Sequence, residues 1–389
     1  ISSVALEELS DRTQLLDFVK STQTSDSLVK LLSLPSFVLI GAQSAGKSLY
    51  LAISMGFPMT FSAVGVGTRS PHKYVMHHGS SDEPTCKVNG APTPFEDVME
   101  EVHNHNLELK DKDMFSSDEF LIECESSTFH DFVMIDLPGI PRRGDNDYDE
   151  VKRVIREKVI SDPNIIIVSL IKAESTDPAN HYFEDVLGPV IGDIRPNYKE
   201  ESIVALNNIN TALSNMDSNE VLNNYFYPAS RHVENMHYVM LRPYGTNNAT
   251  EVNPDKEIDI VKLTQWLQDV RAFKEEEAFH FYLDQIEGRQ NGLKVPPSIR
   301  QKTTFGFGVR ALGERLKDIL VNRYREELPR IVQELENEYK RQKENLDRVN
   351  VKLAAYDVEK VKHTFHQYLN SFESSIKRFI GGIPKIDEE

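Results

Sequence analysis

The stretch Phe37-Val38-Leu39-Ile40-Gly41-Ala42-Gln43-Ser44-Ala45-Gly46-Lys47-Ser48 decides the fold of this chain. Its first four residues are apolar and predict a buried strand, and residues 41–48 match the phosphate-loop pattern GxxxxGK(S/T). The glycines let backbone N–H groups approach phosphate oxygens, and the helix expected over residues 49–55 points the positive end of its dipole at them. In such a loop Lys47 neutralises the β- and γ-phosphates, and the Ser48 hydroxyl binds Mg²⁺. The sequence therefore predicts a site for a nucleoside triphosphate.

The length and charge of the chain limit the classes of molecule that we expect it to bind directly. The chain has 389 residues, more than one ordinary domain, with a formal net charge of −17 and a pI near 5.2. Nucleic acids and anionic bilayers attract basic surfaces, so the acidic balance argues against both as direct partners. We expect contacts with proteins and none with nucleic acid.

The cysteines and the hydropathy pattern bear on the compartment. Two cysteines, Cys86 and Cys124, do not make a disulfide framework, and we expect a reducing compartment such as the cytosol. No apolar run approaches the roughly 20 residues that span a bilayer, and no basic-then-apolar leader opens the chain, so we expect a soluble protein. The chain begins with Ile1 and ends soon after a helical stretch, and we expect it to be part of a longer protein.

The spacing of apolar runs predicts the architecture of the centre. After residues 37–40, runs of strand length alternate with helix-patterned stretches, and these further runs are residues 132–135, 165–170, 202–206 and 238–241. The alternation is typical of an α/β fold with a mostly parallel sheet flanked by helices. One helix is expected between residues 145 and 160, with a buried face formed by Val151, Val154, Ile155 and Val159.

Both ends of the chain have helical patterns. Residues 4–32 are apolar at helical spacings, and Pro35 ends that segment before the first strand. After residue 305 an apolar stripe recurs at spacings of three and four, formed by Val309, Leu312, Leu316 and Ile319. We expect Pro329 to bend or restart this helix. Beyond it two heptad seams predict packing against other helices: Tyr339, Leu346 and Leu353, and Leu335, Val349 and Tyr356.

Two further segments suit the chemistry of a triphosphate site. An apolar strand ends in Asp136-Leu137-Pro138-Gly139, where Asp136 can hold Mg²⁺ through water and the Gly139 N–H can reach the γ-phosphate. The flexible segment 65–71 contains a single threonine, Thr68, which can ligate Mg²⁺ and sense the γ-phosphate. Each segment is weak evidence alone, and together they strengthen the phosphate-loop prediction.

These motifs form a recognisable set. They are Leu34-Pro35, Gln43-Ser44, Gly67-Thr68-Arg69-Ser70-Pro71, Asp136-Leu137-Pro138-Gly139, Asp162-Pro163-Asn164 and Thr176-Asp177-Pro178-Ala179-Asn180. The set resembles the dynamin superfamily of large GTPases, and the likeness extends over nearly the whole chain. Within that superfamily, residues 307–309, 323–324, 338–339 and 364–366 look most like the plastid-division dynamins of plants and algae.

The resemblance implies a domain organisation. Residues 35–300 are expected to form the GTPase domain, residues 1–34 and 301–328 two helices of a bundle signalling element, and residues 329–389 the beginning of a helical stalk. It also implies self-association through the GTPase domain and the stalk. Asp177 and Asn180 are expected in the loop that touches a second GTPase domain.

The resemblance also implies roles at the site. Gln43 would orient the attacking water and Thr68 would close over the γ-phosphate, while a monovalent cation, K⁺ or Na⁺, held near Ser44 would replace an arginine finger. The implied catalytic set is Gln43, Ser44, Lys47, Thr68 and Gly139, with Mg²⁺ held by Ser48, Thr68 and Asp136. The residues implied to contact GTP or GDP are Gly41, Ala45, Gly46, Lys47, Ser48, Leu49, Asn207, Asn208, Asn210 and Arg242.

The base-reading segment departs from the pattern. GTPases read guanine with (N/T)KxD, and this chain has Asn207-Asn208-Ile209-Asn210, so Asn208 replaces the lysine and Asn210 the aspartate. An amide offers one acceptor oxygen where the carboxylate offers two, which would weaken guanine binding by about 1–3 kcal/mol. Leu241-Arg242 similarly stands where many dynamins have Asn-Arg. The sequence therefore leaves guanine selectivity open.

Other polar groups carry weaker signals. His72, His77 and His78 lack metal-ligand spacing and are interpreted as surface residues. The pair Arg142-Arg143 is interpreted as part of a solvated switch loop, and the acidic run at residues 145–150 as favouring a helix N-terminus.

Three functions remain open from the sequence. The leading one is a mechanochemical GTPase in the cytosol that remodels or severs an organelle membrane, with plastid division as the favoured setting and the membrane reached through missing regions or adaptors. The second is a nucleotide-gated scaffold with little hydrolysis, and the third an ATPase or a relaxed NTPase; Asn208 and Asn210 motivate both.

Overall fold

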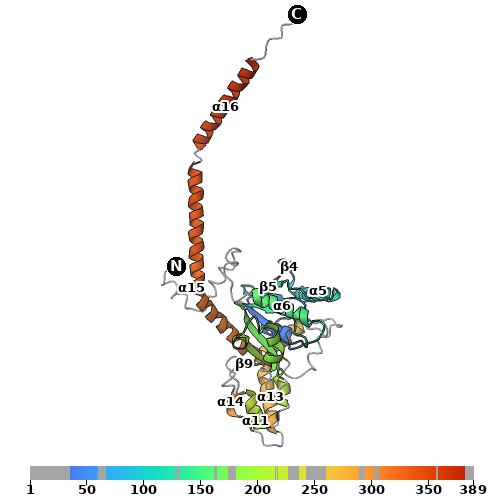
Figure 1. Cartoon of the computed structure of the whole chain (residues 1–389). Helices are drawn as coiled ribbons and strands as arrows, with labels where there is room; N and C mark the ends of the chain where they lie inside the picture. The colour runs from blue at the N-terminus through green and yellow to red at the C-terminus, as the bar shows by residue number, and fades with distance from the viewer. Residues whose placement is uncertain are drawn as a thin grey trace. The chain divides into compact units, whose positions relative to one another are not determined.

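The computed structural model describes most of the chain (Figure 1). The described residues are 36–59, 67–127, 129, 132–161, 164–173, 181–214, 216, 218–226, 236–241, 260–288, 294–301, 306–355 and 358–381. Those up to Tyr324 belong to one compact unit, and those from Arg325 onward belong to a second. The helix predicted at residues 4–32 and the site residues Asp177, Asn180 and Arg242 lie outside the described residues.

Among the described residues of the first unit, ten strands form one sheet, in the order β10-β9-β8-β7-β1-β6-β2-β5-β3-β4. The strands are β1 (Phe37–Ile40), β2 (His72–His78), β3 (Thr85–Val88), β4 (Ala91–Thr93), β5 (Phe120–Ser126), β6 (Phe132–Asp136), β7 (Ile166–Lys172), β8 (Ile203–Asn207), β9 (Met236–Tyr238) and β10 (Gly306–Phe307). The pairings from β6 through β1 to β10 are all parallel, as is the pairing of β2 with β5. Strand β2 runs antiparallel to β6, and β3 runs antiparallel to both β4 and β5. The predicted α/β fold with a mostly parallel sheet is confirmed.

Helices flank this sheet and continue beyond it (Figure 1). The α-helices are α4 (Lys47–Met55), α5 (Val98–Asp111), α6 (Tyr148–Ser161), α8 (Gly188–Ile191), α9 (Tyr198–Glu201), α10 (Ile209–Ser214), α11 (Asn219–Phe226), α12 (Ile260–Asp269), α13 (Glu275–Gly288), α14 (Pro297–Arg300), α15 (Val309–Ala355) and α16 (Val358–Gly381). A 3₁₀ turn, η1 (Phe95–Asp97), precedes α5, and two π-helical segments, η2 (Tyr182–Leu187) and η5 (Val270–Lys274), precede α8 and α13.

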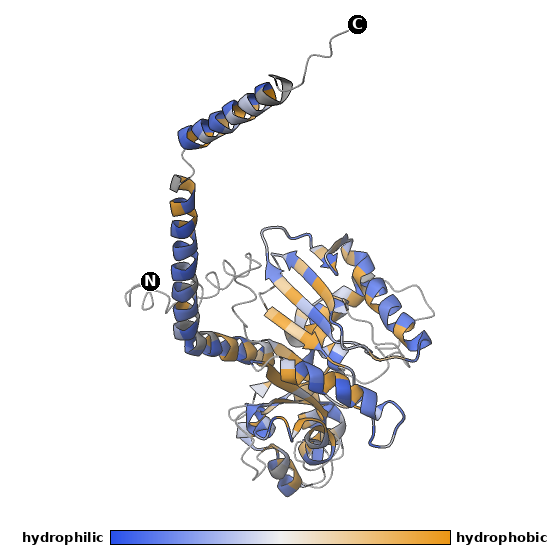
Figure 2. Ribbon diagram, turned by 45° about the horizontal axis from the view of Figure 1, so that its top comes forward, coloured by the Kyte–Doolittle hydropathy of each residue, from blue (hydrophilic) through white to orange (hydrophobic). Residues whose placement is uncertain are grey.

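The central strands are apolar because helices cover both faces. Strand β1 is fully buried along its length, as are all but the last residue of β7 and the whole of β8. Figure 2 shows the apolar colour concentrated in the strands and the hydrophilic colour on the outer helix faces. The helix face predicted between residues 145 and 160 is correct: Val151, Val154, Ile155 and Val159 of α6 are all buried.

Two predictions about this unit need correction. The last apolar run, predicted as a strand over residues 238–241, pairs only over Met236–Tyr238, and the following residues leave the sheet while staying buried. Cys86 and Cys124, interpreted as unpaired thiols, form a disulfide between β3 and β5. The antiparallel register places them directly opposite each other, with Cα atoms 4.2 Å apart, which is why they can be bridged.

Helix α15 differs in detail from its prediction. Its first apolar stripe is buried at Val309, Leu312 and Leu316, but the next buried positions are Leu320 and Val321, while Ile319 is only half-buried. The helix also continues through Pro329. The expected boundary between residues 328 and 329 stays a prediction.

The described residues of the second unit, 325–355 and 358–381, are helical. Several apolar side chains of the predicted seams are exposed there, including Tyr339, Leu346, Val349 and Leu353. Their expected packing against other helices stays a prediction. Within the described residues, no helix is both long enough and apolar enough to cross a membrane.

Candidate nucleotide site

The phosphate loop connects the carboxyl end of β1 to the first turn of α4. Ser44 and Gly46 both have positive φ, 58° and 97°, so the loop makes its tight turn with left-handed residues just before the helix. A Cβ at Gly46 would lie 2.7 Å from Nδ2 of Asn207, and one at Gly41 would overlap the Leu170 carbonyl oxygen. The loop can therefore pack against the carboxyl-terminal part of β7 and β8 only with glycine at these two positions.

Lys47 is held inside this loop. Its side chain is 7% exposed, and its Nζ donates to the Gly41 carbonyl oxygen at 3.4 Å. Burial lowers the pKa of Lys47, and the nearby Asp136 opposes that change. A buried ammonium whose partners are a carbonyl and a nearby carboxylate is placed to attract a phosphate.

Asp136 accepts hydrogen bonds from hydroxyl groups of two separate segments. Its Oδ2 accepts hydrogen bonds from Ser48 of α4 at 3.0 Å and from Thr68 at 3.1 Å. Burial raises the pKa of Asp136, while Lys47 and the two hydroxyl donors act in the opposite direction. The structure thus brings together four residues that the sequence singled out from three places in the chain.

This cluster fits a magnesium ion. Oδ1 of Asp136 is buried and finds no hydrogen-bond partner among the described residues, so one acceptor of this carboxylate is not used. Two hydroxyls beside a carboxylate are the hard oxygen donors that Mg²⁺ takes, usually together with water and phosphate oxygens. Ser48 and Thr68 would hold the ion directly, and Asp136 would hold it through water.

The segment after β6 closes against the phosphate loop. The Gln43 N–H donates to the Ile140 carbonyl at 3.0 Å, and the Ile140 N–H donates to the Gly41 carbonyl at 3.0 Å. A Cβ on Gly139 would lie 2.9 Å from the Cα of Gln43. Gln43 and Gly139 are therefore neighbours, and their catalytic roles stay predictions.

The base-reading segment is tied to the same loop through Asn207. This side chain is 4% exposed, and its Nδ2 donates to the Ala45 carbonyl at 2.9 Å. Its Oδ1 accepts from the N–H groups of Asn208, at 2.7 Å, and Leu241, at 3.3 Å. The predicted base contact is thus a structural link between three segments.

Asn208, Asn210 and Leu49 are also among the residues implied to contact the nucleotide. Asn208 has a positive φ of 63° and precedes α10, which carries Asn210 in its first turn; both side chains are half-buried. Leu49, in the first turn of α4, is also half-buried.

Sequence reasoning missed how the Thr68 segment is anchored. The backbone N–H of Arg69 donates to Asn106 Oδ1 of α5 at 2.9 Å, and its guanidinium lies over the Phe115 ring, 4.6 Å from the centroid, and 4.0 Å from Asp147. Val98, Val102 and Asn106 recur every fourth residue on the buried side of α5. The polar Asn106, in line with two buried valines, was the signal in the sequence that could have indicated this anchor.

One histidine interpretation is wrong. His72, interpreted as a surface residue, is 2% exposed, and burial with a smaller effect of His105 lowers its pKa to about 3. Its Nε2 lies 3.4 Å from Nδ2 of Asn106, so this neutral imidazole belongs to the anchor of the Thr68 segment. Strand alternation explains the error, because His72 lies on the covered face of β2 together with the buried Tyr74 and Met76, whereas His78 is exposed at the end of the strand.

The fold and the site define a phosphate-loop nucleotide-binding domain of the α/β class. Residues 37–181 match the model of the Dynamin family. This chain is 31% identical over 161 residues to the mitochondrial dynamin-like GTPase MGM1 of Chaetomium thermophilum, covering 38% of this chain and 16% of that protein. It is 28% identical over 172 residues to Dynamin-1-like protein of Danio rerio, covering 38% and 25%. It is 26% identical over 178 residues to Dynamin-related protein 4C of Arabidopsis thaliana, covering 43% and 26%.

These matches support the dynamin superfamily for this chain. Each covers between 16% and 26% of the relative's own length. They give no preference for the plastid-division branch.

Proposed function

We propose that this chain is a dynamin-like GTPase that hydrolyses GTP to GDP and phosphate. The observation that carries the proposal is the cluster at Asp136, which accepts hydrogen bonds from Ser48 and Thr68 beside the buried Lys47. Phosphoryl transfer depends mainly on positioning and on neutralising phosphate charge, and these residues supply both. The family match over residues 37–181 supports the same reaction class.

We assign a role in GTP hydrolysis to each of the following residues. Lys47 binds the β- and γ-phosphates, Gln43 orients the attacking water, and the Gly139 N–H binds the γ-phosphate. Bound Mg²⁺ would neutralise charge on the β- and γ-phosphate oxygens. Ser44 would lie beside a monovalent cation that would add to this charge compensation, an assignment that rests on the superfamily resemblance.

We further propose that hydrolysis is coupled to self-association and movement of the C-terminal helices. Asp177 and Asn180 would contact a second GTPase domain, and α15 would carry the resulting displacement toward the stalk. This movement would remodel or sever an organelle membrane from the cytosolic side. The chain would reach that membrane through adaptors or further regions. We assign plastid division on the motif resemblance in residues 307–309, 323–324, 338–339 and 364–366.

The base-reading segment favours a second candidate, an NTPase with relaxed base specificity. Asn208 and Asn210 replace the lysine and aspartate that bind guanine in most GTPases, and an amide at residue 210 offers a donor as well as an acceptor. Xanthine carries a carbonyl where guanine carries an amine, so Asn210 suits xanthine at least as well.

Nucleotide binding with turnover tests these proposals. Equilibrium affinities for GTP, XTP and ATP in the presence of Mg²⁺ should be measured on the full chain and on Lys47→Ala. Preference for GTP, with turnover lost in Lys47→Ala, supports the GTPase. Equal affinities for the three nucleotides, together with turnover, support the relaxed NTPase. Nucleotide binding without phosphate release would instead support the nucleotide-gated scaffold.

A further inference from the structure

Glu275 is a buried carboxylate outside the nucleotide site. It is the first residue of α13 and follows the π-helical segment η5 directly. Its side chain is 4% exposed, and its two oxygens accept hydrogen bonds from two different segments of the chain. A π-helical insertion is often found at functional positions, and here it sets the point at which the carboxylate enters the core.

One oxygen binds the segment that leads to the nucleotide site. Oε1 accepts from the Met240 N–H at 2.7 Å. The next residue, Leu241, donates its N–H to Oδ1 of Asn207, and Nδ2 of Asn207 donates to the Ala45 carbonyl in the phosphate loop. Three consecutive hydrogen-bonded steps therefore connect Glu275 with that loop.

The other oxygen binds the first residue of the long helix. Oε2 accepts from the Val309 N–H at 2.6 Å, at the N-terminus of α15, where a negative charge is favourable. Gly308 approaches this carboxylate with a φ of 90°, and a Cβ there would lie 3.2 Å from Oε2. The start of α15 is thus held to the same side chain as the Met240 segment.

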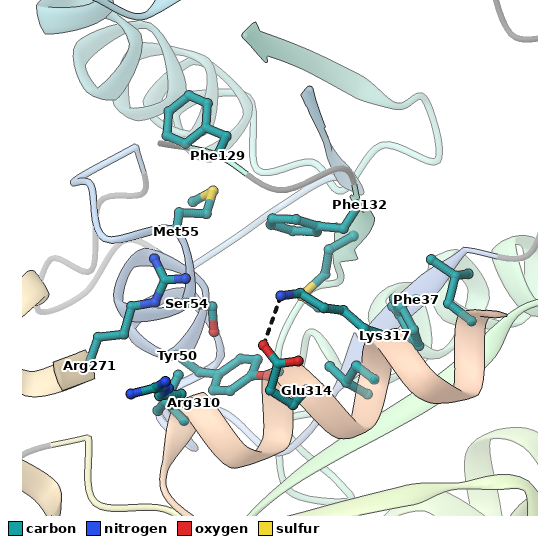
Figure 3. Close-up of a pocket in the computed structure, with 15 residues that line it drawn as sticks. Phe37, Tyr50, Ser54, Met55, Phe129, Phe132, Arg271, Arg310, Glu314 and Lys317 are labelled. Carbon is teal, nitrogen blue, oxygen red and sulfur yellow. Dashed lines mark hydrogen bonds and ion pairs between the residues drawn. The ribbon is translucent and has the colours of Figure 1, made fainter. Parts of the chain in front are cut away.

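The first turns of α15 also face α4, the helix that follows the phosphate loop. Tyr50 on the α4 side and Arg310, Glu314 and Lys317 on the α15 side line one pocket (Figure 3). Burial raises the pKa of Tyr50, and the ionised Glu275 adds a smaller increase. Helix α15 is therefore in contact with the nucleotide domain where Glu275 caps it.

We propose that Glu275 is a positioning residue that couples the nucleotide site to the start of helix α15. A movement of the Met240–Leu241 segment either breaks a hydrogen bond to a buried carboxylate or carries the Val309 end of the helix with it. Packed interiors favour the second outcome, because an unpaired buried acceptor is costly. This inference rests on the proposed nucleotide-dependent function.

The test compares Glu275→Gln with Glu277→Gln in the full chain. Glutamine keeps one acceptor but turns an amide donor toward the second N–H, whereas Glu277 is exposed on the same helix and serves as the matched control. Amide hydrogen exchange of residues 309–312 is measured without nucleotide, with GDP and with a non-hydrolysable GTP analogue. Affinity for each nucleotide is measured on the same samples.

The expected result is a nucleotide-dependent change in exchange at residues 309–312 in the wild type and in Glu277→Gln. In Glu275→Gln this change should shrink at least about threefold, while nucleotide affinity changes by less than about threefold. Glu275→Asp keeps both acceptor oxygens and should restore part of the change, and it also serves if the glutamine variant does not fold.

Two results would overturn the inference while leaving nucleotide hydrolysis intact. One is a wild type that binds nucleotide with no change at residues 309–312, and the other is a folded Glu275→Gln that transmits the change in full. A wild type that binds no nucleotide at all would instead refute the proposed function, and the inference with it.

Discussion

The pH dependence of stability at Glu275 gives a sharp quantitative prediction. Burial raises the pKa of this carboxyl from 4.5 to about 7, although the two backbone N–H donors oppose the change. The charged group that acts on it is Glu276, on its own helix, which raises the pKa further. Between pH 4.5 and 7 the folded state binds more protons than the unfolded state, so the free energy of unfolding falls as pH rises through this window.

The magnitude follows from the size of this change. Moving a pKa from 4.5 to about 7 is equivalent to about 3 kcal/mol at about 1.4 kcal/mol per pH unit, and most of it falls between about pH 5 and pH 8. The Glu275→Gln side chain does not titrate. The unfolding free energy of the wild type minus that of Glu275→Gln should therefore decrease by about 2–3 kcal/mol from about pH 5 to about pH 8.

Urea unfolding measures this difference directly. Trp266 is the single tryptophan and lies in α12, so its fluorescence reports on the first unit. The titrations are repeated at several pH values on both proteins. Subtracting the two unfolding free energies at each pH cancels the contribution of groups that the substitution does not affect. A difference that is flat over this range, or that grows with pH, would refute the reasoning, because the two N–H donors would then outweigh burial.

Three further predictions concern packing and covalent structure. Gly139→Ala places a Cβ 2.9 Å from the phosphate-loop backbone and should lower the phosphate-release rate by about 10- to 100-fold; an unchanged rate would contradict the close approach. Asn207→Ala removes three hydrogen bonds of a buried side chain and should cost about 2–4 kcal/mol in urea unfolding, against less than about 0.5 kcal/mol for the exposed Asn197→Ala; equal costs would refute the link. Reducing the Cys86–Cys124 disulfide, which joins residues 38 positions apart, should cost about 3–4 kcal/mol, and thiol titration before and after reduction should find none and then two; two thiols before reduction would contradict the bond.

The centre of the fold was predictable because its signals are local. The phosphate loop, the strand ending at Asp136 and the buried face of α6 each depend on residues close together in sequence. Parallel strands covered on both faces are continuously apolar, so their runs stand out without any knowledge of pairing. The superfamily resemblance added roles for these residues but no contacts.

The wing of the sheet was not predictable in the same way. Strands β2, β3 and β5 alternate buried residues with half-buried or exposed ones and contain histidine, cysteine or charged side chains, so no apolar run marks them. The Cys86–Cys124 pair follows from the register of β3 with β5, which depends on residues far apart in sequence. The burial of His72 has the same origin.

Long-range contacts also explain why Glu275 was missed. It opens a run of three glutamates, a pattern typical of a solvated helix start, yet it is buried while the next two residues are exposed. Its two partners are backbone N–H groups 35 and 34 residues away. Composition and periodicity carry no record of such contacts.

The measurement that tests the central claim most directly is steady-state phosphate release from GTP in the presence of Mg²⁺ and K⁺. Wild type and Lys47→Ala are compared at low and high protein concentration. We expect GTP turnover per molecule in the wild type to rise with protein concentration, and Lys47→Ala to lose at least about 100-fold of that turnover. Turnover that is absent in the wild type, or equal in the two proteins, would contradict a GTPase built on Lys47 and Asp136.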